Sequence, residues 1–560
     1  MAHRPTIVSL MTKITGARAL VECLLREGID HVWGIPGTQN LPLIDALRDT
    51  PEIRFVLTRH EQGAAFMAYG FARASGQPAV VTATEGPGVT NLVTGTAAAY
   101  KGFVPVLSVC GLQEEWVRER DANQDIDQTS LFQPITKWAY SIPSAAKIQE
   151  ATRRAFRLAL DAPLGPVHLD ASRDVLLEEI EREDIRPSAY RPTSQPDCTP
   201  ECLDEVMALL AEAERPLFVV GGGILREGLT APMQRLAELS GLPVAALQYY
   251  PDGFPSTHPL ALGPLGRNGW ASANQTAPRA DVIVAVGAHI DVYSTTFRYG
   301  VFSREAKLVH HSVVPSDIGV VFPVALAVTG STASFVQGLA DRVHRSGKRW
   351  DWIDVAKARA DWDIERNADV DDEADPIASQ FVARTMRQVL PRNGAMVVDA
   401  GNAGKHMRVY YDTYEPGTFM SIDDWASVGG AFPIALGAKL ARPDRPVMCT
   451  VGDMGMMCNV GELETAVREK IPVVCVIFND EGLGNERAYQ KELYGGRLYA
   501  VDYGAVDFGG IARAMGAWGE RVSHPAELAP ALRRALESNQ PAVVDVQINK
   551  ETLAEVLFKA

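Results

Sequence analysis

Two acidic, glycine-rich turns in the last third of the chain could bind a metal ion and a phosphorylated ligand. The turn GDMG at 452–455 follows a strand-like run at 447–450, and the turn NDEG at 479–482 follows the buried run VVCVIF at 473–478. Open α/β sheets bind ligands beyond the carboxyl ends of their strands, so both turns are expected at one ligand-binding edge. The alternative is that these are two acidic turns that bind no ligand.

The residue types in these turns suit a divalent cation that neutralises a diphosphate. Asp453, Asp480 and the carbonyl of Gly482 offer the oxygen ligands that hard cations prefer. Gly452 and Gly455 would let the backbone approach the diphosphate closely, because glycine has no Cβ atom.

Two further candidates lie near the start of the chain. Glu61, in the segment RHEQGAA at 59–65, stands between the strand-like run 53–58 and a helix of small residues, so Gly and Ala residues lie close to it in the sequence. The alternative is that Glu61 is a solvated residue that favours a helix start, as most glutamates in such a position are. The other candidate is the glycine-rich turn TEGPGVTN at 84–91, which follows the strand-like run at 79–84.

Apolar runs and amphipathic stretches alternate along the whole chain, which favours parallel sheets covered by helices. Residues 184–200 are rich in proline and polar residues, and residues 345–376 are charged with few aliphatic side chains, so both are predicted to be linkers, the second partly helical. The fold class predicted is therefore α/β with three doubly wound domains. Their expected bounds are 10–183, 201–343 and 377–560.

Charge and composition limit the partners. The chain of 560 residues has a formal net charge of −15, which argues against nucleic acid or an anionic membrane as its main partner. It contains no apolar run of about 20 residues and no pattern of a cleaved signal peptide, so we expect no membrane span and a cytoplasmic location. Seven scattered cysteines fit a reducing compartment.

Together these segments resemble the thiamine-diphosphate enzyme family over nearly the whole chain. Residues 59–65 are similar to its catalytic glutamate segment, and residues 84–95 are similar to its turn beside the pyrimidine ring. Residues 452–482 resemble its diphosphate and magnesium motif, and Asp453 and Asp480 are 27 residues apart as in that motif. The segments PITKW at 134–138, AxQDxD at 122–127, FPIALGAKLA at 432–441 and YQKELYGGR at 489–497 resemble the branch of acetolactate synthase and pyruvate oxidase.

The resemblance implies a role for particular residues. Glu61 would be catalytic and would hydrogen-bond the aminopyrimidine of the coenzyme, and Mg²⁺ would be held by Asp453, Asp480 and Gly482. Val428 aligns with the bulky residue that keeps the coenzyme bent. The residues implied to bind the coenzyme are Pro36, Pro87, Asn91, Asn402, Val428, Gly452, Asp453, Met454, Gly455, Asp480 and Gly482. The residues implied on the substrate side are Gln124, Lys137, Glu85 and Tyr489.

The family's reaction is the decarboxylation of a 2-oxo acid with transfer of the acyl carbanion to an acceptor. The acceptor can be a second oxo acid, an aldehyde, a proton or phosphate. Family precedent also places each site between two chains, with the glutamate from one and the metal motif from the other. The resemblance therefore implies a homodimer or homotetramer acting on small molecules.

Four positions depart from the branch that the chain resembles. Met454 replaces a glycine or alanine, Asp480 replaces the usual asparagine, and Glu85 stands where serine is frequent. Tyr293 occupies the position of the arginine that recognises the second oxo acid. Arg298, nearby in the sequence, is the candidate to replace that arginine. These changes argue against acetolactate formation itself.

The flavin-binding pattern of the relatives is also altered. Their strand ends in His-Ile-Asp-Ile-Asp-Pro, whereas residues 310–315 read HHSVVP, so both aspartates are absent. This change argues against FAD in the central domain. His310 and His311 are expected to be structural.

Three other functions stay open. The first is a phosphate-dependent acetyltransferase similar to sulfoacetaldehyde acetyltransferase, because the segment REKIPVVCVIFND at 468–480 resembles that enzyme. The second is a simple 2-oxo acid decarboxylase, although the usual His-His pair is missing from residues 105–125. The third is a catalytically silent homologue, which the presence of both Glu61 and Asp453 argues against.

Overall fold

The computed structural model describes residues 13–118, 120–192, 194–296, 300–368, 370–422 and 425–554. These residues form two compact units. The first comprises the described residues up to 192 except 74–76, and the second comprises residues 74–76 and the described residues from 194 onward. Each unit is described by itself below.

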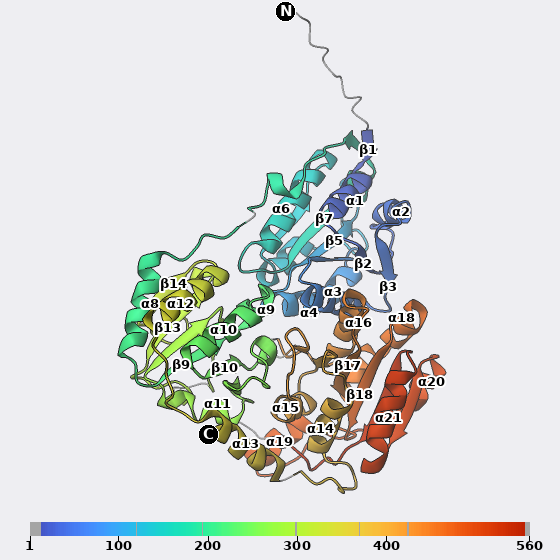
Figure 1. Ribbon diagram of the computed structural model, residues 1–560. Helices are drawn as coiled ribbons and strands as arrows, with labels where there is room; N and C mark the ends of the chain where they lie inside the picture. Colours follow the sequence, from blue (N-terminus) through green and yellow to red (C-terminus); the bar gives the residue numbers. More distant parts are fainter. Residues whose placement is uncertain are drawn as a thin grey trace, which may run out of the picture. The chain divides into compact units, whose positions relative to one another are not determined.

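The first unit is built on a six-stranded parallel sheet with strand order β3-β2-β4-β5-β7-β6 (Figure 1). The strands are β2 (His31–Gly34), β3 (Arg54–Leu57), β4 (Ala79–Thr82), β5 (Val106–Leu112), β6 (Trp138–Ile142) and β7 (Val167–Ser172). The helices are α1 (Gly16–Arg26), α2 (Leu41–Arg48), α3 (Glu61–Ser75), α4 (Pro87–Lys101), α5 (Gln128–Phe132), α6 (Ile148–Leu160) and α7 (Arg173–Leu177). A short antiparallel pair, β1 (Lys13–Thr15) and β8 (Glu179–Glu181), joins the two ends of this segment.

The second unit contains two parallel six-stranded sheets. The first of them has the order β11-β10-β9-β12-β13-β14. Its strands are β9 (Pro216–Val220), β10 (Val244–Leu247), β11 (Ala261–Leu265), β12 (Val282–Val286), β13 (Lys307–Ser312) and β14 (Leu326–Thr329). The helices in this part are α8 (Pro200–Glu212), α9 (Gly222–Arg226), α10 (Thr230–Ser240), α11 (Ala271–Asn274), α12 (Thr332–Ser346) and α13 (Val355–Ala368).

The C-terminal sheet has the order β16-β15-β17-β18-β20-β19. Its strands are β15 (Ala395–Val398), β16 (Phe419–Ser421), β17 (Val447–Gly452), β18 (Val473–Asn479), β19 (Trp518–Val522) and β20 (Ala542–Gln547). Its helices are α14 (Ser379–Val389), α15 (Asn402–Tyr410), α16 (Ala431–Ala441), α17 (Asp453–Asn459), α18 (Glu462–Glu469), α19 (Gly484–Leu493), α20 (Phe508–Ala514) and α21 (Pro525–Glu537).

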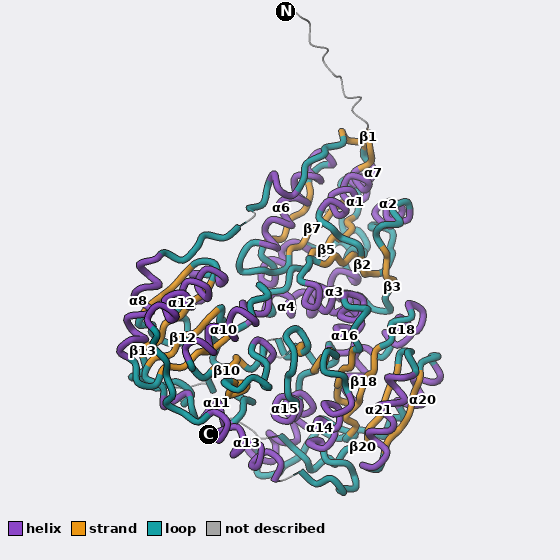
Figure 2. The backbone as a smooth tube through the Cα atoms, viewed as in Figure 1, coloured by secondary structure: helices purple, strands orange, loops and turns teal. Residues whose placement is uncertain are grey.

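The first and last sheets share one topology. When the strands of each sheet are numbered from one, both orders read 2-1-3-4-6-5, whereas the middle sheet reads 3-2-1-4-5-6. In Figure 2 the strands of each sheet lie among helices, as expected where strands are buried on both faces. The central strands are buried throughout: every residue of β9, β12 and β18 is buried, and all are apolar except Asn479 at the end of β18. Three parallel, helix-covered sheets confirm the predicted α/β fold class.

The charged stretch at 345–376 is more structured than a plain linker. It contains α13, whose Arg359 donates to the carbonyl of Ser256 at 2.6 Å and whose Arg366 pairs with Asp412 at 3.2 Å. The long cationic side chains anchor this helix, because it has few buried apolar residues of its own. The predicted partial helix is therefore present and packed.

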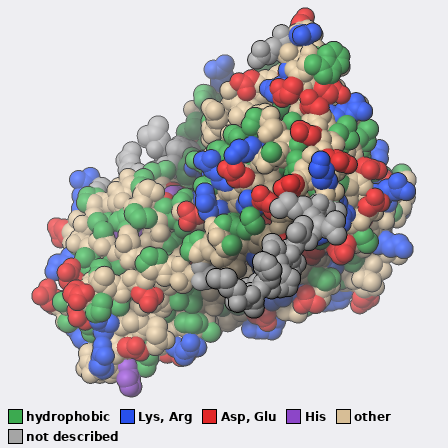
Figure 3. Space-filling view, turned by 90° about the horizontal axis from the view of Figure 1, so that it is seen from above, with side chains coloured by type: hydrophobic (Ala, Val, Ile, Leu, Met, Phe, Trp, Pro, Cys, Tyr) green, Lys and Arg blue, Asp and Glu red, His purple; other side chains and the backbone are tan. Residues whose placement is uncertain are grey.

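The surface agrees with the composition. Figure 3 shows acidic and basic side chains interspersed over the visible face. Among the described helices, none is both long and apolar enough to cross a membrane.

Candidate functional site

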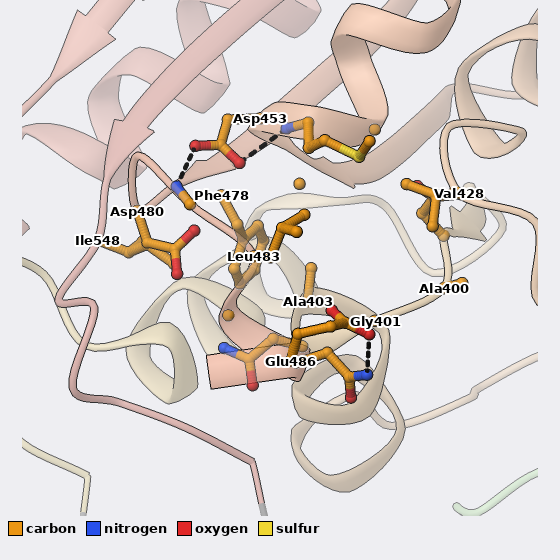
Figure 4. Close-up of a pocket in the computed structure, with 18 residues that line it drawn as sticks. Ala400, Gly401, Ala403, Val428, Asp453, Phe478, Asp480, Leu483, Glu486 and Ile548 are labelled. Atoms are coloured by element: carbon orange, nitrogen blue, oxygen red, sulfur yellow. Dashed lines mark hydrogen bonds between the residues drawn. The ribbon is translucent and has the colours of Figure 1, made fainter. Parts of the chain in front are cut away.

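A pocket lies at the carboxyl ends of β15, β17 and β18. Its walls come from the segments at 399–403, 452–455 and 478–486, with Val428 and Ile548 completing it (Figure 4). β15 and β17 are neighbours in the sheet. The chain continues from β15 to β16 on one side and from β17 to β18 on the other, so the carboxyl ends of β15 and β17 form a topological switch point. Such points are where doubly wound sheets bind ligands. Both acidic turns predicted from the sequence lie in this one pocket.

Asp453 is fixed by three donors. It is the first residue of α17, and its carboxylate accepts hydrogen bonds from the backbone N–H of Met454 at 2.7 Å and of Gly482 at 3.2 Å. The hydroxyl of Tyr503 lies 2.6 Å from Oδ1 of Asp453 and 3.2 Å from the carbonyl oxygen of Gly482. One group therefore reaches both oxygens, which shows that the carboxylate and the carbonyl converge on a common point.

Asp480 faces the same pocket from the end of β18. Its Oδ2 accepts a hydrogen bond of 2.7 Å from Nη1 of Arg487, and the side chain is almost fully buried. Burial and the nearby charge of Asp453 raise the pKa of Asp480 to about 6. Two buried carboxylates that repel one another are a site that a bound cation would stabilise.

The donor set fits a hard divalent cation. Two carboxylates and one carbonyl are oxygen ligands, and a small cation completes its shell with water and phosphate oxygens. In the described part of the chain, no group of three or more His, Cys, Asp and Glu side chains is arranged to hold a metal. The candidate site is therefore limited to two acidic side chains and depends on the carbonyl of Gly482.

The same pocket suits a diphosphate. Two helices, α15 and α19, begin at its wall, and helix N-termini present unpaired N–H groups and a partial positive charge to an anion. A Cβ atom built on Gly452 would meet no other atom within 4 Å, so a ligand can approach this backbone from the pocket. Gly484 is required for close packing, because its Cβ would lie 2.8 Å from Oδ2 of Asp480.

Gly455 lines the pocket and also packs against a second carboxylate. A Cβ atom there would lie 2.7 Å from Oδ2 of Asp399, a fully buried carboxylate that the prediction overlooked. Asp399 accepts hydrogen bonds from the N–H groups of Gly429 at 2.8 Å and Ala431 at 3.3 Å. Gly455 thus makes room for Asp399, and Asp399 holds the turn that carries Val428.

Val428 and Met454 both project into the pocket region. Their exposed fractions are 45 and 40 %, so neither side chain belongs to the core. Met454 therefore does not point into the core. The side-chain amide of Asn459 stabilises the turn that carries Val428 by donating to the carbonyl of Gly429 at 2.8 Å.

Asn402 contacts the C-terminal segment through its side chain. Its amide nitrogen donates to the carbonyl of Thr552 at 3.2 Å, and its amide oxygen accepts from the N–H of Ala554 at 2.8 Å. It still lines the pocket as the first residue of α15. In this arrangement the side-chain amide of Asn402 is engaged by the C-terminal segment, and the residue begins the helix at the pocket wall.

In the first unit, Glu61 and the turn at 84–91 lie in contact. Glu61 is the first residue of α3 and only 8 % exposed, and its Oε2 accepts a hydrogen bond of 2.9 Å from the side-chain amide of Asn91. A Cβ atom on Gly88 would lie 3.2 Å from Oε1 of Glu61. Asn91 therefore fixes one carboxylate oxygen, and the absence of a side chain at Gly88 keeps space beside the other.

Pro36 and Pro87 lie at the same edge of this sheet, in the segments that follow β2 and β4. Both are exposed, and Pro87 is the first residue of α4. The two segments are in contact, because a Cβ atom on Gly37 would lie 2.4 Å from the side chain of Thr84. This is the switch point of the first sheet, as the 2-1-3-4-6-5 order requires.

Glu85 is fully buried, next to a pocket that contains Arg118, Asp125 and Asp170. Its Oε2 accepts from the N–H of Gln113 at 2.9 Å, and Oε1 has no hydrogen-bond partner. Burial raises the pKa of Glu85 to about 7. This carboxyl is thus poised to exchange a proton near neutral pH.

Gln124 lies close to the turn that carries Glu85. It has a positive φ of 72°, and its carbonyl oxygen would lie 2.6 Å from a Cβ atom on Gly86. Lys137 lies elsewhere. It directly precedes β6, and its amine donates to the carbonyl of Asp161 at 2.6 Å, at the amino edge of the sheet. Within this unit the structure does not bring Lys137 to Glu61, because the two flank opposite ends of parallel strands.

Tyr489 is held by residues of both parts of the second unit. Its hydroxyl accepts a hydrogen bond of 2.7 Å from Arg267, and the amine of Lys405 lies 5.1 Å from its ring centroid. The guanidinium of Arg267 also lies 5.6 Å from the ring centroid of Tyr293. A cation therefore does lie at the segment where the relatives carry arginine. The predicted substitute, Arg298, falls outside the described residues.

His310 and His311 make structural contacts. Nε2 of His310 is 2.8 Å from the carbonyl of Ala288, and His311 bonds to the backbone of Gly287 and Gly330 through its two ring nitrogens. Both side chains are buried, and burial lowers the pKa of His311 to about 4. They therefore anchor strand ends as neutral rings.

Polar residues at the site that escaped the sequence analysis include Asp399, which lines the pocket, and Arg487 and Tyr503, which bond to Asp480 and Asp453. Asp399 lies three residues before Asn402, which the family resemblance implied to bind the coenzyme, so its position gave a usable signal. Arg487 and Tyr503 follow Asp480 by 7 and 23 residues in a polar stretch, and no local pattern marks them. Only the folding of α19 and the next loop brings them to the carboxylates.

Three family models match the chain in order. The "Thiamine pyrophosphate enzyme, N-terminal TPP binding domain" matches residues 14–131. The central domain of the same enzymes matches residues 203–339, and their C-terminal TPP binding domain matches residues 399–546. The matches include Glu61, Asn91, Asp453 and Asp480.

Relatives of known name are similar over almost their full length. A probable acetolactate synthase large subunit of Methanocaldococcus jannaschii is 34 % identical over 95 % of this chain and 92 % of its own. The large subunit of acetolactate synthase isozyme 3 of Escherichia coli is 30 % identical over 96 % of both chains. A sulfoacetaldehyde acetyltransferase of Castellaniella defragrans is 30 % identical over 98 % of this chain and 94 % of its own. Together with the pocket and the three matching domains, this similarity shows that the chain belongs to the thiamine pyrophosphate enzyme family.

Proposed function

We propose that this enzyme uses thiamine diphosphate and Mg²⁺ to decarboxylate a 2-oxo acid and to transfer the acyl carbanion to an acceptor. The observation that carries the proposal is the pocket at the switch point of the C-terminal sheet. There two carboxylates and a carbonyl meet the N-termini of two helices. The names of the relatives support the reaction class.

The residues of the second unit would hold the diphosphate end of the coenzyme. Asp453, Asp480 and the Gly482 carbonyl are the proposed ligands of Mg²⁺, which would offset the charge of the diphosphate. Val428, held by the Asp399 turn, is the proposed contact of the central part of the coenzyme. When bound, thiamine diphosphate supplies the electron sink that lets a 2-oxo acid lose carbon dioxide.

The proton chemistry falls to Glu61 in the first unit. We assign to it the hydrogen bond with the aminopyrimidine ring, with the shared proton at Oε1, because Asn91 already occupies Oε2. A general acid of this kind contributes through position as much as through acidity. Pro36, Pro87 and Gln124 surround the same edge and are the proposed neighbours of the coenzyme and substrate. Lys137 is assigned no contact, since it lies at the opposite edge.

Two acceptor classes have specific support. Carboligation, in which the acceptor is a second oxo acid or an aldehyde, is favoured by the acetolactate synthase relatives. A phosphate-dependent acetyltransferase is favoured by the sulfoacetaldehyde acetyltransferase relative. Arg267, against Tyr293 and Tyr489, supplies a cation that suits an anionic acceptor in either case. Release of a free aldehyde is the third outcome to be tested.

The proposal includes no flavin. In the central part, His310 and His311 direct their ring nitrogens to backbone groups, and the two aspartates of the relatives are absent. We further propose a cytoplasmic homodimer or homotetramer. Exposed apolar side chains near the pocket, among them Val428, Met454 and Met457, support burial against another chain.

The test has two stages. The purified protein is titrated with thiamine diphosphate by calorimetry, with and without Mg²⁺, beside the variant Asp453→Asn. Binding that requires Mg²⁺ and is weakened in the variant is expected, and no binding by the wild-type protein would end the proposal. The loaded protein is then incubated with pyruvate, with and without phosphate or an aldehyde. Mass spectrometry distinguishes acetolactate or another ligation product, acetyl phosphate, and acetaldehyde.

A further inference from the structure

A buried arginine stands directly behind the candidate metal site. Arg487 lies on α19 and its side chain is 1 % exposed. Its Nη1 donates to Oδ2 of Asp480 at 2.7 Å, and its Nη2 donates to Oδ1 of Asp502, also at 2.7 Å. The guanidinium thus binds the Asp480 oxygen and joins the metal turn to the loop that carries Tyr503.

The turn itself is shaped around this guanidinium. A Cβ atom on Gly482 would lie 2.2 Å from Nη2 of Arg487 and 2.5 Å from the carbonyl oxygen of Val501. Since no side chain fits there, residue 482 has to be glycine for Arg487 to reach its position. The residue that offers a carbonyl to the cation is therefore packed against the arginine that pairs with the neighbouring carboxylate.

The charges around the site compensate one another. Asp480 stands where the relatives carry a neutral asparagine, which adds one negative charge to a nearly buried position. Arg487 adds one positive charge at hydrogen-bond distance. Asp502, its other partner, is largely exposed, so water screens its charge.

We propose that Arg487 is a positioning residue for the cation site: it offsets the charge of Asp480 and holds Oδ2, which leaves Oδ1 to face the cation. This inference rests on the proposed function, because it concerns the Mg²⁺ site named there. It assigns the two residues as one unit, in which the charge of each compensates that of the other.

The unit has an unusual consequence. Asp480→Asn restores the residue of the relatives, yet it leaves the positive charge of Arg487 beside a site with one remaining carboxylate. Cation binding should therefore weaken by roughly 100-fold, because an uncompensated charge at this range acts strongly on a divalent ion. The double variant Asp480→Asn/Arg487→Met removes both charges. It should bind the cation within about threefold of the wild-type protein, by the same charge balance.

The experiment measures Mn²⁺ binding by electron paramagnetic resonance in the presence of thiamine diphosphate, so it does not depend on turnover. A second double variant, Asp480→Asn/Arg487→Lys, keeps the positive charge and should stay as weak as Asp480→Asn. The matched control is Asp480→Asn/Arg468→Met, which removes a charge from the exposed pair of Arg468 and Glu464 on α18. It too should stay weak. The Arg487→Met double variant removes both charges of the buried pair together, so its folding is expected to persist.

The outcomes separate the inference from the function. Rescue by Arg487→Met, and not by Arg487→Lys or Arg468→Met, would support charge compensation. If the Arg487→Met double variant binds Mn²⁺ as weakly as Asp480→Asn, Arg487 has no such role, while the proposed function stands. If the wild-type protein does not bind Mn²⁺ with thiamine diphosphate, both fail.

Discussion

The buried carboxylates of this chain differ in the hydrogen-bond partners of their oxygens. Glu61 receives an amide hydrogen bond and keeps one oxygen beside a glycine, whereas Asp480 is paired with a guanidinium. Glu85 has one backbone donor and one oxygen without a partner. Because a buried carboxylate is stable only when its oxygens are paired, these surroundings indicate which group can share a proton and which stays ionised.

The side chain of Glu61 can be tested without removing its hydrogen bonds. Glu61→Gln keeps the size of the side chain but cannot donate or accept the same proton. Turnover of 2-oxo acid should fall by about 10²- to 10⁴-fold, the usual range for a lost general acid or base. Calorimetry should show nearly unchanged binding of thiamine diphosphate with Mg²⁺. Full activity of this variant would contradict the proposed mechanism, and Glu52→Gln, at an exposed position, is the control.

Glu85 should make stability depend on pH. Burial raises its pKa to about 7 from an ordinary value of 4.5, so the folded state holds the proton more tightly than the unfolded state does. The free energy of unfolding is therefore lost as the pH rises from about 4.5 past 7. Glu85→Gln should match the wild-type protein at pH 5 and exceed its stability by about 1–3 kcal/mol at pH 8.

Urea unfolding at the two pH values measures this effect, with Glu52→Gln as an exposed control. An equal difference between Glu85→Gln and wild type at both pH values would show that the Glu85 carboxyl does not titrate in this range. The neighbours of Glu85 include Asp125, Asp170 and Arg118, and all three remain in the variant.

At the scale of elements, the repeated strand order determines where the candidate residues lie in the first and last sheets. The first and last sheets both read 2-1-3-4-6-5, and the candidate residues of each follow strands that flank its switch point or lie next to those strands. In the last sheet, the turn after β17 supplies Asp453 and the turn after β18 supplies Asp480. Parallel strands present their carboxyl ends at one edge, so residues distant in sequence meet there.

The two glycines at 452 and 482 should respond differently to a Cβ atom. Gly482→Ala brings the Cβ within 2.2 Å of Arg487, whereas Gly452→Ala meets no atom within 4 Å. The first change should lower the free energy of unfolding by about 1–3 kcal/mol through overpacking. The second should change it by less than about 0.5 kcal/mol but weaken binding of thiamine diphosphate, since the Cβ enters the pocket.

Thermal unfolding without ligand and calorimetry with thiamine diphosphate measure the two effects separately. Equal stability of the two variants would show that the Arg487 packing is not as tight as the structure indicates. Normal coenzyme binding by Gly452→Ala would place the diphosphate away from this turn.

At the scale of the whole molecule, the proposed oligomer can be tested through its active sites. If Glu61 of one chain serves the metal motif of another, Glu61→Gln and Asp453→Asn should complement each other. Random pairing of the two inactive chains makes half of the dimers hybrid, and one of the two sites in each hybrid carries both residues. Coexpression should then restore up to roughly a quarter of wild-type activity.

Activity of coexpressed chains is compared with each variant expressed alone, and size-exclusion chromatography with light scattering gives the oligomeric state. No gain from coexpression, in samples shown to contain hybrids, would place both residues of a site on one chain. A monomer with full activity would contradict the proposed oligomer.

The sequence by itself determined the fold class and the pairing of the two acidic turns. Both follow from local patterns: buried apolar runs that alternate with amphipathic stretches predict parallel sheets, and turns after such runs must lie at the carboxyl edge. For the same reason Glu61 and the turn at 84–91 were correctly predicted to follow strands of one sheet. These features can be predicted because they depend on the order of residues along single elements.

Only the tertiary structure decided how the polar atoms of the site are satisfied. The side chain of Asn402 binds the C-terminal segment, Lys137 lies at the opposite edge of its sheet, and Gly455 makes room for Asp399. Arg487 and Tyr503 reach the acidic turns from later segments without any motif to mark them. Hydrogen bonds and close packing depend on which segments meet in space, and that information belongs to the folded chain as a whole.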